Sequence, residues 1–275
     1  MLSSLFRNNP GSLFDVYLLT DSLTDSSAKQ LSGLCSEFGH RLILKTIDRS
    51  LLRGARVSDH VSLATYYRVL IPVLLPSTVN RVLFLDSDII VRHDLASFYN
   101  QPLERFTHAG IASPFARDDM KRLGIPESDH YFNGGVLLLN LELWRAEAIS
   151  ERILDYIRLH GPALIWWDQD ALNAVLHGRW RCWPPKWNAT DGFFHKHPVT
   201  LLEVSESDYR EAVEDPCIVH FSGSYKPWMP GFSHPFKGEY EKYERFFSRE
   251  NSVWKGRFAV KSQVKKLVKK CLSRS

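Results

Sequence analysis

The chain has 275 residues, of which 44% are hydrophobic and 24% are charged, a composition typical of a folded globular protein. No apolar run reaches the roughly 18 residues of a membrane span, and the segment Met1–Pro10 lacks the apolar core of a signal peptide. The net charge of +4 hides an asymmetry, because residues 251–275 contain eight Lys or Arg and no acidic residue. The remainder carries 27 basic against 31 acidic residues, a formal charge of −4.

The cysteines are scattered and none are in C-x-x-C spacing, which predicts a reduced compartment and argues against a zinc site. They are Cys35, Cys182, Cys217 and Cys271.

The first half of the chain predicts alternating strands and helices. Strands are expected at Leu13–Leu19, Arg41–Ile47 and Val82–Leu85, and helices at Asp25–Phe38 and at Ser62–Leu70, the latter ended by Pro72. This alternation is typical of a parallel sheet with crossover helices, so we expect an α/β fold.

The second half is less regular. Short strands are expected at Thr107–Ala112, Val136–Leu139 and Cys217–Phe221, and helices at Leu141–Leu159, Trp167–Leu176 and Glu239–Phe247. Phe115–His130 is predicted to be a loop and Asn133–Gly135 a turn before a strand. The aromatic-rich stretch Arg179–Pro198 supports no assignment.

The end of the chain predicts a basic amphipathic helix. Val260, Val264 and Leu267 fall on one helical face, whereas Lys261, Lys265 and Lys266 fall on the other. Such a helix suits an anionic membrane surface. A helix docked on the protein body, with its basic face in solvent, is the alternative. The net acidic body shows no nucleic-acid motif, so no nucleic-acid partner is expected.

Asp86 and Asp88 directly follow an apolar strand and precede a second apolar run, Ile89–Val91. Strand ends in an α/β sheet face the crevice where ligands bind, so two carboxylates there can share one hard cation. His220 also ends an apolar strand and is expected at the same crevice. This mixed oxygen and nitrogen set suits Mn²⁺ or Mg²⁺. Taken alone, an Asp-x-Asp is more often a cap, and a single histidine more often part of a core.

The segment after His220 carries Gly223 and Lys226, which suit close backbone approach and phosphate contact. A divalent ion at the carboxylates could bridge two phosphate oxygens and neutralise a leaving diphosphate, with Lys226 adding a point charge.

Three further sets of residues are weaker candidates for binding. Asn133 offers a donor and an acceptor beside two glycines, and Asp168-Gln169 at a helix start can bind sugar hydroxyls. His60 and Arg68 lie eight residues apart and can share a helical face. A turn, a helix cap and surface placement are the respective alternatives.

Together these segments resemble glycosyltransferase family 8, the retaining enzymes that use nucleotide sugars. The resemblance covers roughly residues 1 to 230 and looks strongest toward the bacterial lipopolysaccharide galactosyl- and glucosyltransferases. It follows one order along the chain: His60…Tyr66-Tyr-Arg68, Phe84-Leu-Asp-Ser-Asp-Ile-Ile90, Tyr131-Phe-Asn-Gly-Gly-Val136, Trp167-Asp-Gln-Asp170 and His220-Phe-Ser-Gly223…Lys226-Pro-Trp228.

The resemblance implies a Rossmann-like nucleotide-sugar-binding sheet of the glycosyltransferase A type, in a catalytic domain at 1–250 followed by the tail 251–275. It implies a role for each candidate, with Mn²⁺ bound by Asp86, Asp88 and His220, the diphosphate by Lys226 and the Gly223 backbone, and the donor by Arg68, His60, Asn133 and Asp168. Gln169 would lie beneath the reacting sugar carbon. Because Gln169 is a poor nucleophile, we assign it positioning and electrostatic support.

One departure concerns the start of the chain. The family opens with a strand whose Asp and Tyr hold the uridine, followed by a helix that resembles Ser3–Pro10. The first strand is therefore expected to be missing, which would open a gap in the sheet and remove base contacts. Either Met1 is an internal methionine of a longer frame, or the chain is a truncated product.

The predicted function is Mn²⁺-dependent, retaining transfer of galactose or glucose from a UDP-sugar to a lipopolysaccharide core or similar glycan. The enzyme is expected in the cytoplasm, at the inner face of the cytoplasmic membrane. The alternative is an impaired, truncated transferase that acts only as a membrane-surface binding protein. The Arg179–Pro198 aromatics are interpreted as a wall for the acceptor or as packing.

Overall fold

The computed structural model describes residues 1–275 except 54, 56–62, 114–115, 196–203 and 251–275. In this part of the chain the strands are β1 (Asp15–Thr20), β2 (Arg41–Thr46), β3 (Arg81–Leu85), β4 (Ile89–Val91), β5 (His108–Ala112), β6 (Phe132–Asn140), β7 (Trp180–Cys182), β8 (Ala189–Thr190) and β9 (Ile218–His220). The α-helices are α1 (Leu2–Asn8), α2 (Asp25–Glu37), α3 (Ile71–Leu74), α4 (Ala96–Tyr99), α5 (Arg117–Leu123), α6 (Leu141–Ala146), α7 (Ile149–His160), α8 (Trp167–Leu176), α9 (Asp191–His195), α10 (Glu206–Glu214) and α11 (Lys237–Glu250). Short 3₁₀ helices are η1 (Arg49–Leu52), η2 (Leu63–Leu70), η3 (Gly161–Ala163) and η4 (Pro185–Trp187).

The described strands form three sheets, ordered β1-β2, β3-β6-β5-β7 and β4-β9-β8. Parallel pairs are β1 with β2, β5 with β7 and β8 with β9, whereas β3 with β6, β5 with β6 and β4 with β9 are antiparallel. The predicted α/β class is confirmed. The expected parallel pairing with a crossover helix holds for β1 and β2, which α2 connects, but not for β3, which pairs antiparallel with β6. The connection from β5 to β6 returns at the same end of the sheet instead of crossing its face, so β6 runs against both neighbours.

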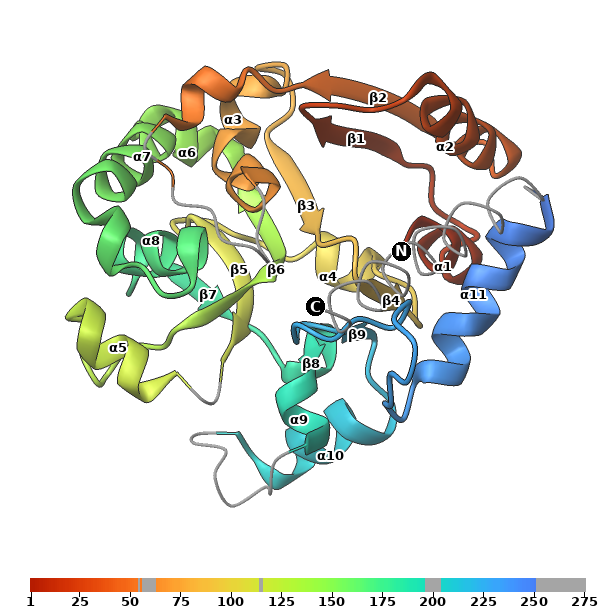
Figure 1. Ribbon diagram of the computed structural model, residues 1–275. Coiled ribbons are helices and arrows are strands. Elements are labelled where there is room, and N and C mark those ends of the chain that lie inside the picture. The colour runs from red at the N-terminus through yellow and green to blue at the C-terminus, as the bar shows by residue number, and fades with distance from the viewer. Residues whose placement is uncertain (54, 56–62, 114–115, 196–203, 251–275) are drawn as a thin grey trace, which may run out of the picture.

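Strand β6 lies at the centre of the largest sheet and is buried on both faces. Leu137 and Leu139 pack in one apolar cluster with η2, α6, α7 and α8. Val136 and Leu138 point the other way, into a cluster with α1, α2 and β4. Figure 1 shows α6, α7 and α8 on one side of this sheet and α1 and α11 on the other. Each such fully buried aliphatic side chain contributes about 1.5–3 kcal/mol.

The β1–β2 pair lies apart from the larger sheet. Among the described residues, β3 pairs along one edge only, with β6, and β1 pairs along one edge only, with β2. Side chains still bridge the two sheets, because Tyr17 and Leu19 pack in the same cluster as Val82 and Phe84.

The predicted loop at Phe115–His130 contains helix α5, so that prediction is wrong. Asp118 and Asp119 lie in the first turn and Lys121 and Arg122 in the last, which complements the helix dipole. Gly124 ends the helix in a left-handed conformation with φ of 69°.

Two helix predictions are also corrected. The single helix expected at Leu141–Leu159 is two helices, because Ala148 interrupts it with φ of 49°. Pro72 does not end the preceding helix, since it lies in the first turn of α3, where no backbone N–H is needed.

Cys35 and Cys217 are buried free thiols. No helix in the described ranges combines the length and the apolarity needed to cross a bilayer. The predicted basic helix at 251–275 and the candidate donor residue His60 lie outside the described residues.

Candidate metal and donor-binding site

The turn between β3 and β4 carries Asp86 and Asp88, and backbone pairing brings His220 to it. The antiparallel β4–β9 register sets Ile89 opposite His220. The Phe221 N–H continues this ladder and donates to the Asp88 carbonyl at 3.0 Å. As a result, His220 Nε2 lies 3.4 Å from Asp88 Oδ1 and 3.8 Å from Asp86 Oδ2. The sequence predicted this meeting of three residues, and the structure brings them together.

These three side chains fit a divalent cation. Each offers one ligand atom, and the three atoms lie within 4.8 Å of one another. His220 is buried, with 4% of its side chain exposed, while Asp86 and Asp88 are 27% and 15% exposed. His220 Nδ1 is hydrogen-bonded to Asn188 Oδ1 at 2.9 Å, so Nε2 is the nitrogen that faces the carboxylates. Two carboxylate oxygens and one imidazole nitrogen suit Mn²⁺ or Mg²⁺.

The segment Asn133–Gly135 lies inside strand β6, so its prediction as a turn is wrong. The glycines are explained by close approach of two side chains to the strand. A Cβ on Gly135 would lie 2.1 Å from His220 Cε1, and one on Gly134 would lie 2.8 Å from an Arg68 terminal nitrogen. Only glycine leaves room for both groups at the centre of the sheet.

Two cations balance the paired carboxylates. Lys226 Nζ lies 2.5 Å from Asp88 Oδ2, and Arg68 Nη2 lies 3.3 Å from Asp86 Oδ1. Burial alone would raise the pKa of Asp88, but interactions with His220 and Lys226 outweigh it and hold that pKa well below its usual range. Asp88 is therefore ionised, as a metal ligand must be.

Asp168 is buried and forms an internal ion pair. Its Oδ2 lies 2.9 Å from Arg68 Nε, and the Thr65 hydroxyl donates to its Oδ1 at 2.5 Å. Burial raises the pKa of Asp168 to about 6, against the opposing effects of Arg68 and Thr65. In this structure Asp168 fixes Arg68, which in turn contacts Asp86.

The half-buried amide of Gln169 is held in one orientation. Its Oε1 accepts from the Gly134 N–H at 2.9 Å and from Asn133 Nδ2 at 3.2 Å. Its Nε2 donates to the Tyr131 hydroxyl at 3.2 Å, and that hydroxyl donates to Asp170 Oδ1 at 2.8 Å. A side chain restrained this way can position a ligand but is not an activated nucleophile.

Gly223 lies on the loop that follows β9, and Asp191 holds that loop. The Gly223 N–H donates to Asp191 Oδ2 at 2.5 Å, and a Cβ on Gly223 would lie 2.7 Å from the same oxygen. The N–H that the sequence assigned to the diphosphate is thus bonded to Asp191 in this structure. The assignment of Gly223 to the diphosphate stays a prediction.

Sequence reasoning missed Asn188 and Asp191, which support His220 and Gly223. Both fall in the aromatic-rich stretch that supported no assignment. A usable signal was present, since both interrupt an aromatic run as Trp187-Asn188-Ala-Thr-Asp191. The described aromatics there favour packing over an acceptor wall, because Trp187 is 6% exposed and stacks on Phe98 with centroids 5.2 Å apart.

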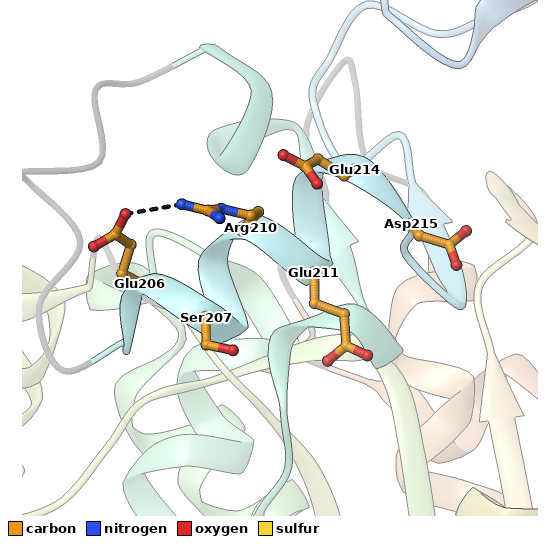
Figure 2. Close-up of a pocket in the computed structure, with 6 residues that line it drawn as sticks. All are labelled: Glu206, Ser207, Arg210, Glu211, Glu214 and Asp215. Carbon is orange, nitrogen blue, oxygen red and sulfur yellow. Dashed lines mark hydrogen bonds and ion pairs between the residues drawn. The ribbon is translucent and has the colours of Figure 1, made fainter.

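A shallow hollow of about 540 Å³ lies elsewhere, along α10. Figure 2 shows that acidic side chains dominate it and that Glu206 pairs with Arg210. The nitrogen–oxygen distance of this ion pair is 3.1 Å. No residue of the Asp86, Asp88 and His220 group lines it. Its acidic lining does not suit an anionic donor, so the site at the strand ends is the better candidate.

The mixed α/β architecture, with the Asp86, Asp88 and His220 group where strands of two sheets meet, has the A fold of glycosyltransferases. The structure is similar to that of the galactosyltransferase LgtC in complex with donor and acceptor sugar analogues. The TM-score is 0.78 at 20% identity, and the match covers 88% of this chain and 90% of that one. The glycosyltransferase GlyE of Streptococcus pneumoniae TIGR4 gives a TM-score of 0.65 at 24% identity, covering 88% and 56% of the two chains.

The chain belongs to glycosyl transferase family 8, whose sequence profile matches residues 1–230. It is 30% identical to General stress protein A of Bacillus subtilis (strain 168) over 233 residues, which is 83% of this chain and 81% of that protein. It is 25% identical to a lipopolysaccharide 1,2-glucosyltransferase of Escherichia coli (strain K12) over 258 residues, 92% and 74% of the two. The family resemblance predicted from the ordered motifs is confirmed.

Proposed function

We propose that this glycosyltransferase moves galactose or glucose from a UDP-sugar to a lipopolysaccharide core oligosaccharide or a similar glycan, with retention of anomeric configuration and dependence on Mn²⁺ or Mg²⁺. The observation that carries the proposal is the Asp86, Asp88 and His220 group, with ligand atoms within 4.8 Å of one another. A lipopolysaccharide glucosyltransferase among the relatives supports the class of acceptor.

The residues in and around this group have different proposed roles. Asp86, Asp88 and His220 would hold the cation, which when bound supplies positive charge to the donor diphosphate and its departure. Lys226 adds a second positive charge beside Asp88. Arg68 is 8% exposed and is held by Asp168, so it fixes the Asp86 carboxylate.

Gln169 and Asn133 would position the transferred sugar. Both are half-buried, and the Gly134 N–H fixes the amide of Gln169. The paired carboxylates that retaining glycosidases place across the sugar are not evident in the sequence. The proposal therefore has Gln169 position the sugar carbon and support its charge, without attacking it.

The proposal is tested with the full chain, UDP-galactose or UDP-glucose, Mn²⁺ and a delipidated or intact lipopolysaccharide core. We expect transfer from one donor, its loss with EDTA and its recovery with added Mn²⁺. Asp88→Asn should remove transfer by weakening the cation site, and Asp155→Asn is the control because Asp155 is 62% exposed on α7. Full transfer by Asp88→Asn, or transfer that resists EDTA, would contradict the metal dependence.

The alternative, an impaired transferase acting only as a membrane-surface binding protein, gains no support from the described residues. The candidate cation ligands, Lys226 and Gln169 are assembled in one place, as a working site requires. We also propose that residues 251–275, with eight Lys or Arg and no acidic residue, bring the enzyme to an anionic membrane surface.

A further inference from the structure

Asn188 is a fully buried residue whose side chain contacts His220 at Nδ1, the ring nitrogen that does not face Asp86 and Asp88. It lies between η4 and β8, and its exposed fraction is 0%. Its Oδ1 is 2.9 Å from His220 Nδ1, and its Nδ2 donates to Asn133 Oδ1 at 2.8 Å. One amide therefore joins the cation group to the residues around Gln169.

A backbone donor fixes which atom donates and which accepts in the hydrogen bonds that link Asn133, Asn188 and His220. The Gly135 N–H donates to an Asn133 side-chain atom at 2.9 Å, so that atom must be the acceptor Oδ1. The Asn188 atom facing the same oxygen must then be the donor Nδ2, which leaves Asn188 Oδ1 facing His220. An oxygen at that position accepts only from a protonated Nδ1.

The proton on Nδ1 determines which histidine nitrogen can bind a cation. In a neutral imidazole only one nitrogen carries hydrogen, so Nε2 keeps its lone pair. Nε2 is the nitrogen that lies 3.4 Å from Asp88 Oδ1 and 3.8 Å from Asp86 Oδ2. Turning the ring over would place Cδ2 instead of Nδ1 opposite Asn188 Oδ1 and lose that hydrogen bond.

The same amide reaches the other half of the site. Asn133 Oδ1 accepts from both Asn188 and Gly135, which directs Asn133 Nδ2 toward Gln169 Oε1 at 3.2 Å. A change in the Asn188 amide therefore reaches Gln169 through one intervening side chain.

We propose that Asn188 is a positioning residue that locks His220 as an Nδ1-protonated, Nε2-binding ligand and simultaneously orients Asn133 and Gln169. The inference rests on the proposed function for its catalytic consequence, whereas its structural part concerns the cation-free protein. Mutation of a residue that hydrogen-bonds to a metal ligand in this way typically lowers metal affinity about 10–100-fold.

Two variants of the full chain separate the two hydrogen bonds. Asn188→Leu removes both, so Mn²⁺ affinity, measured by electron paramagnetic resonance without nucleotide, should fall about 10–100-fold. Asn188→Asp keeps an acceptor for His220 but replaces the donor to Asn133 with a second acceptor. Its Mn²⁺ affinity should stay within about threefold of wild type, while kcat falls about tenfold because Asn133 and Gln169 are misdirected. Asn9→Leu is the control, since Asn9 is 1% exposed and its side chain donates to the Leu5 carbonyl and accepts from the Leu95 N–H.

The tautomer is read directly from ¹⁵N-histidine spectra of the metal-free protein at alkaline pH, with the His220 signals assigned from their loss in His220→Gln. We expect Nδ1-protonated His220 in wild type, Asn188→Asp and Asn9→Leu, and a mixed tautomer in Asn188→Leu. If Asn188→Leu does not fold, the spectrum, affinity and turnover of Asn188→Asp decide the matter.

The proposal is overturned if wild-type His220 is Nε2-protonated, or if Asn188→Leu loses stability yet keeps the tautomer and the Mn²⁺ affinity. It is also overturned if Asn188→Asp turns over as wild type does. An Nδ1-protonated His220 in a protein that transfers no sugar would contradict the proposed function and support the positioning role.

Discussion

His220 Nε2 and Asp88 Oδ1 lie 3.4 Å apart because the β4–β9 backbone pairing sets His220 opposite Ile89. The hydrogen bond from the Phe221 N–H to the Asp88 carbonyl holds the two segments together without any help from the side chains. The group is therefore largely preformed by the fold, and a cation would not have to gather its ligands from separate mobile loops. Damage to the packing around His220 should then affect metal binding before it affects the rest of the fold.

Gly135→Ala tests this packing. The new Cβ would lie 2.1 Å from His220 Cε1 and 2.6 Å from Nδ1, so either the imidazole or strand β6 must move. Overpacking of this kind costs about 1–3 kcal/mol in the free energy of unfolding, measured by urea denaturation. Mn²⁺ affinity should fall in the same variant because His220 is displaced.

Gly33→Ala is the matched control for that substitution. Gly33 lies inside helix α2, and a Cβ there would meet nothing within 4 Å. Because Ala is favoured over Gly in a helix, this variant should gain about 0.5–1 kcal/mol. Equal unfolding free energies and Mn²⁺ affinities for the two variants would show that His220 does not need the space at Gly135.

Gln169→Ala should mainly lower turnover. The Gln169 amide is aimed by the Gly134 N–H and by Tyr131, so its removal takes away a preorganised dipole without disturbing the cation group. Losing one such group costs on the order of 100-fold in kcat. Steady-state kinetics with the donor varied measures this, and Gln101→Ala, at a position just after α4, should match wild type. An effect confined to donor affinity would argue against a place for Gln169 at the reacting carbon.

The raised pKa of Asp168 predicts that the stability of the protein depends on pH. Its pKa is about 6 in the folded protein against 3.8 as the ordinary value, so the folded state binds this proton more tightly than the unfolded chain does. The contribution of Asp168 to stability therefore increases as the pH falls from about 6 toward 3.8. The unfolding free energy of wild type minus that of Asp168→Asn should rise by roughly 1–3 kcal/mol across this window. Urea denaturation with EDTA checks it, and a difference that is constant or shrinks on acidification would contradict the prediction.

Much of the site was predictable because it depends on strand ends. Asp86 and Asp88 follow the apolar run Val82–Leu85, and His220 ends the apolar strand β9, so the sequence places all three at strand ends. In the structure they meet across two sheets, because β9 runs antiparallel to β4, which begins directly after Asp88. The α/β class followed from the same alternation of apolar strands and helices. The direction of β6 was not predictable, since the pattern of Val136, Leu137 and Leu138 is identical in parallel and antiparallel pairs.

The supporting residues could not be inferred because their roles come from tertiary contacts. Asn133–Gly135 has the composition of a turn. The two glycines in this central strand are explained only by the close contacts of Arg68 with Gly134 and of His220 with Gly135, which the sequence does not reveal. Asn188 is one polar residue in an aromatic run until β8 pairs with β9 and carries it to His220. Helix α5 was missed although its charges were ordered for a helix, because its residues show no apolar periodicity.

The basic C-terminal segment is predicted to bind anionic membrane surfaces. Residues 251–275 carry eight Lys or Arg without an acidic residue, against a body of formal charge −4. Removal of this segment should release the protein from vesicles containing phosphatidylglycerol, while transfer to a soluble acceptor stays largely intact. Replacing Lys265, Lys266, Lys269 and Lys270 by Gln should weaken binding by roughly 1 kcal/mol per lysine, because each interacts with the negative surface potential. Flotation with phosphatidylcholine vesicles is the control, and added salt should weaken binding to the anionic vesicles. Binding that survives the truncation would place the membrane contact on the body of the enzyme instead.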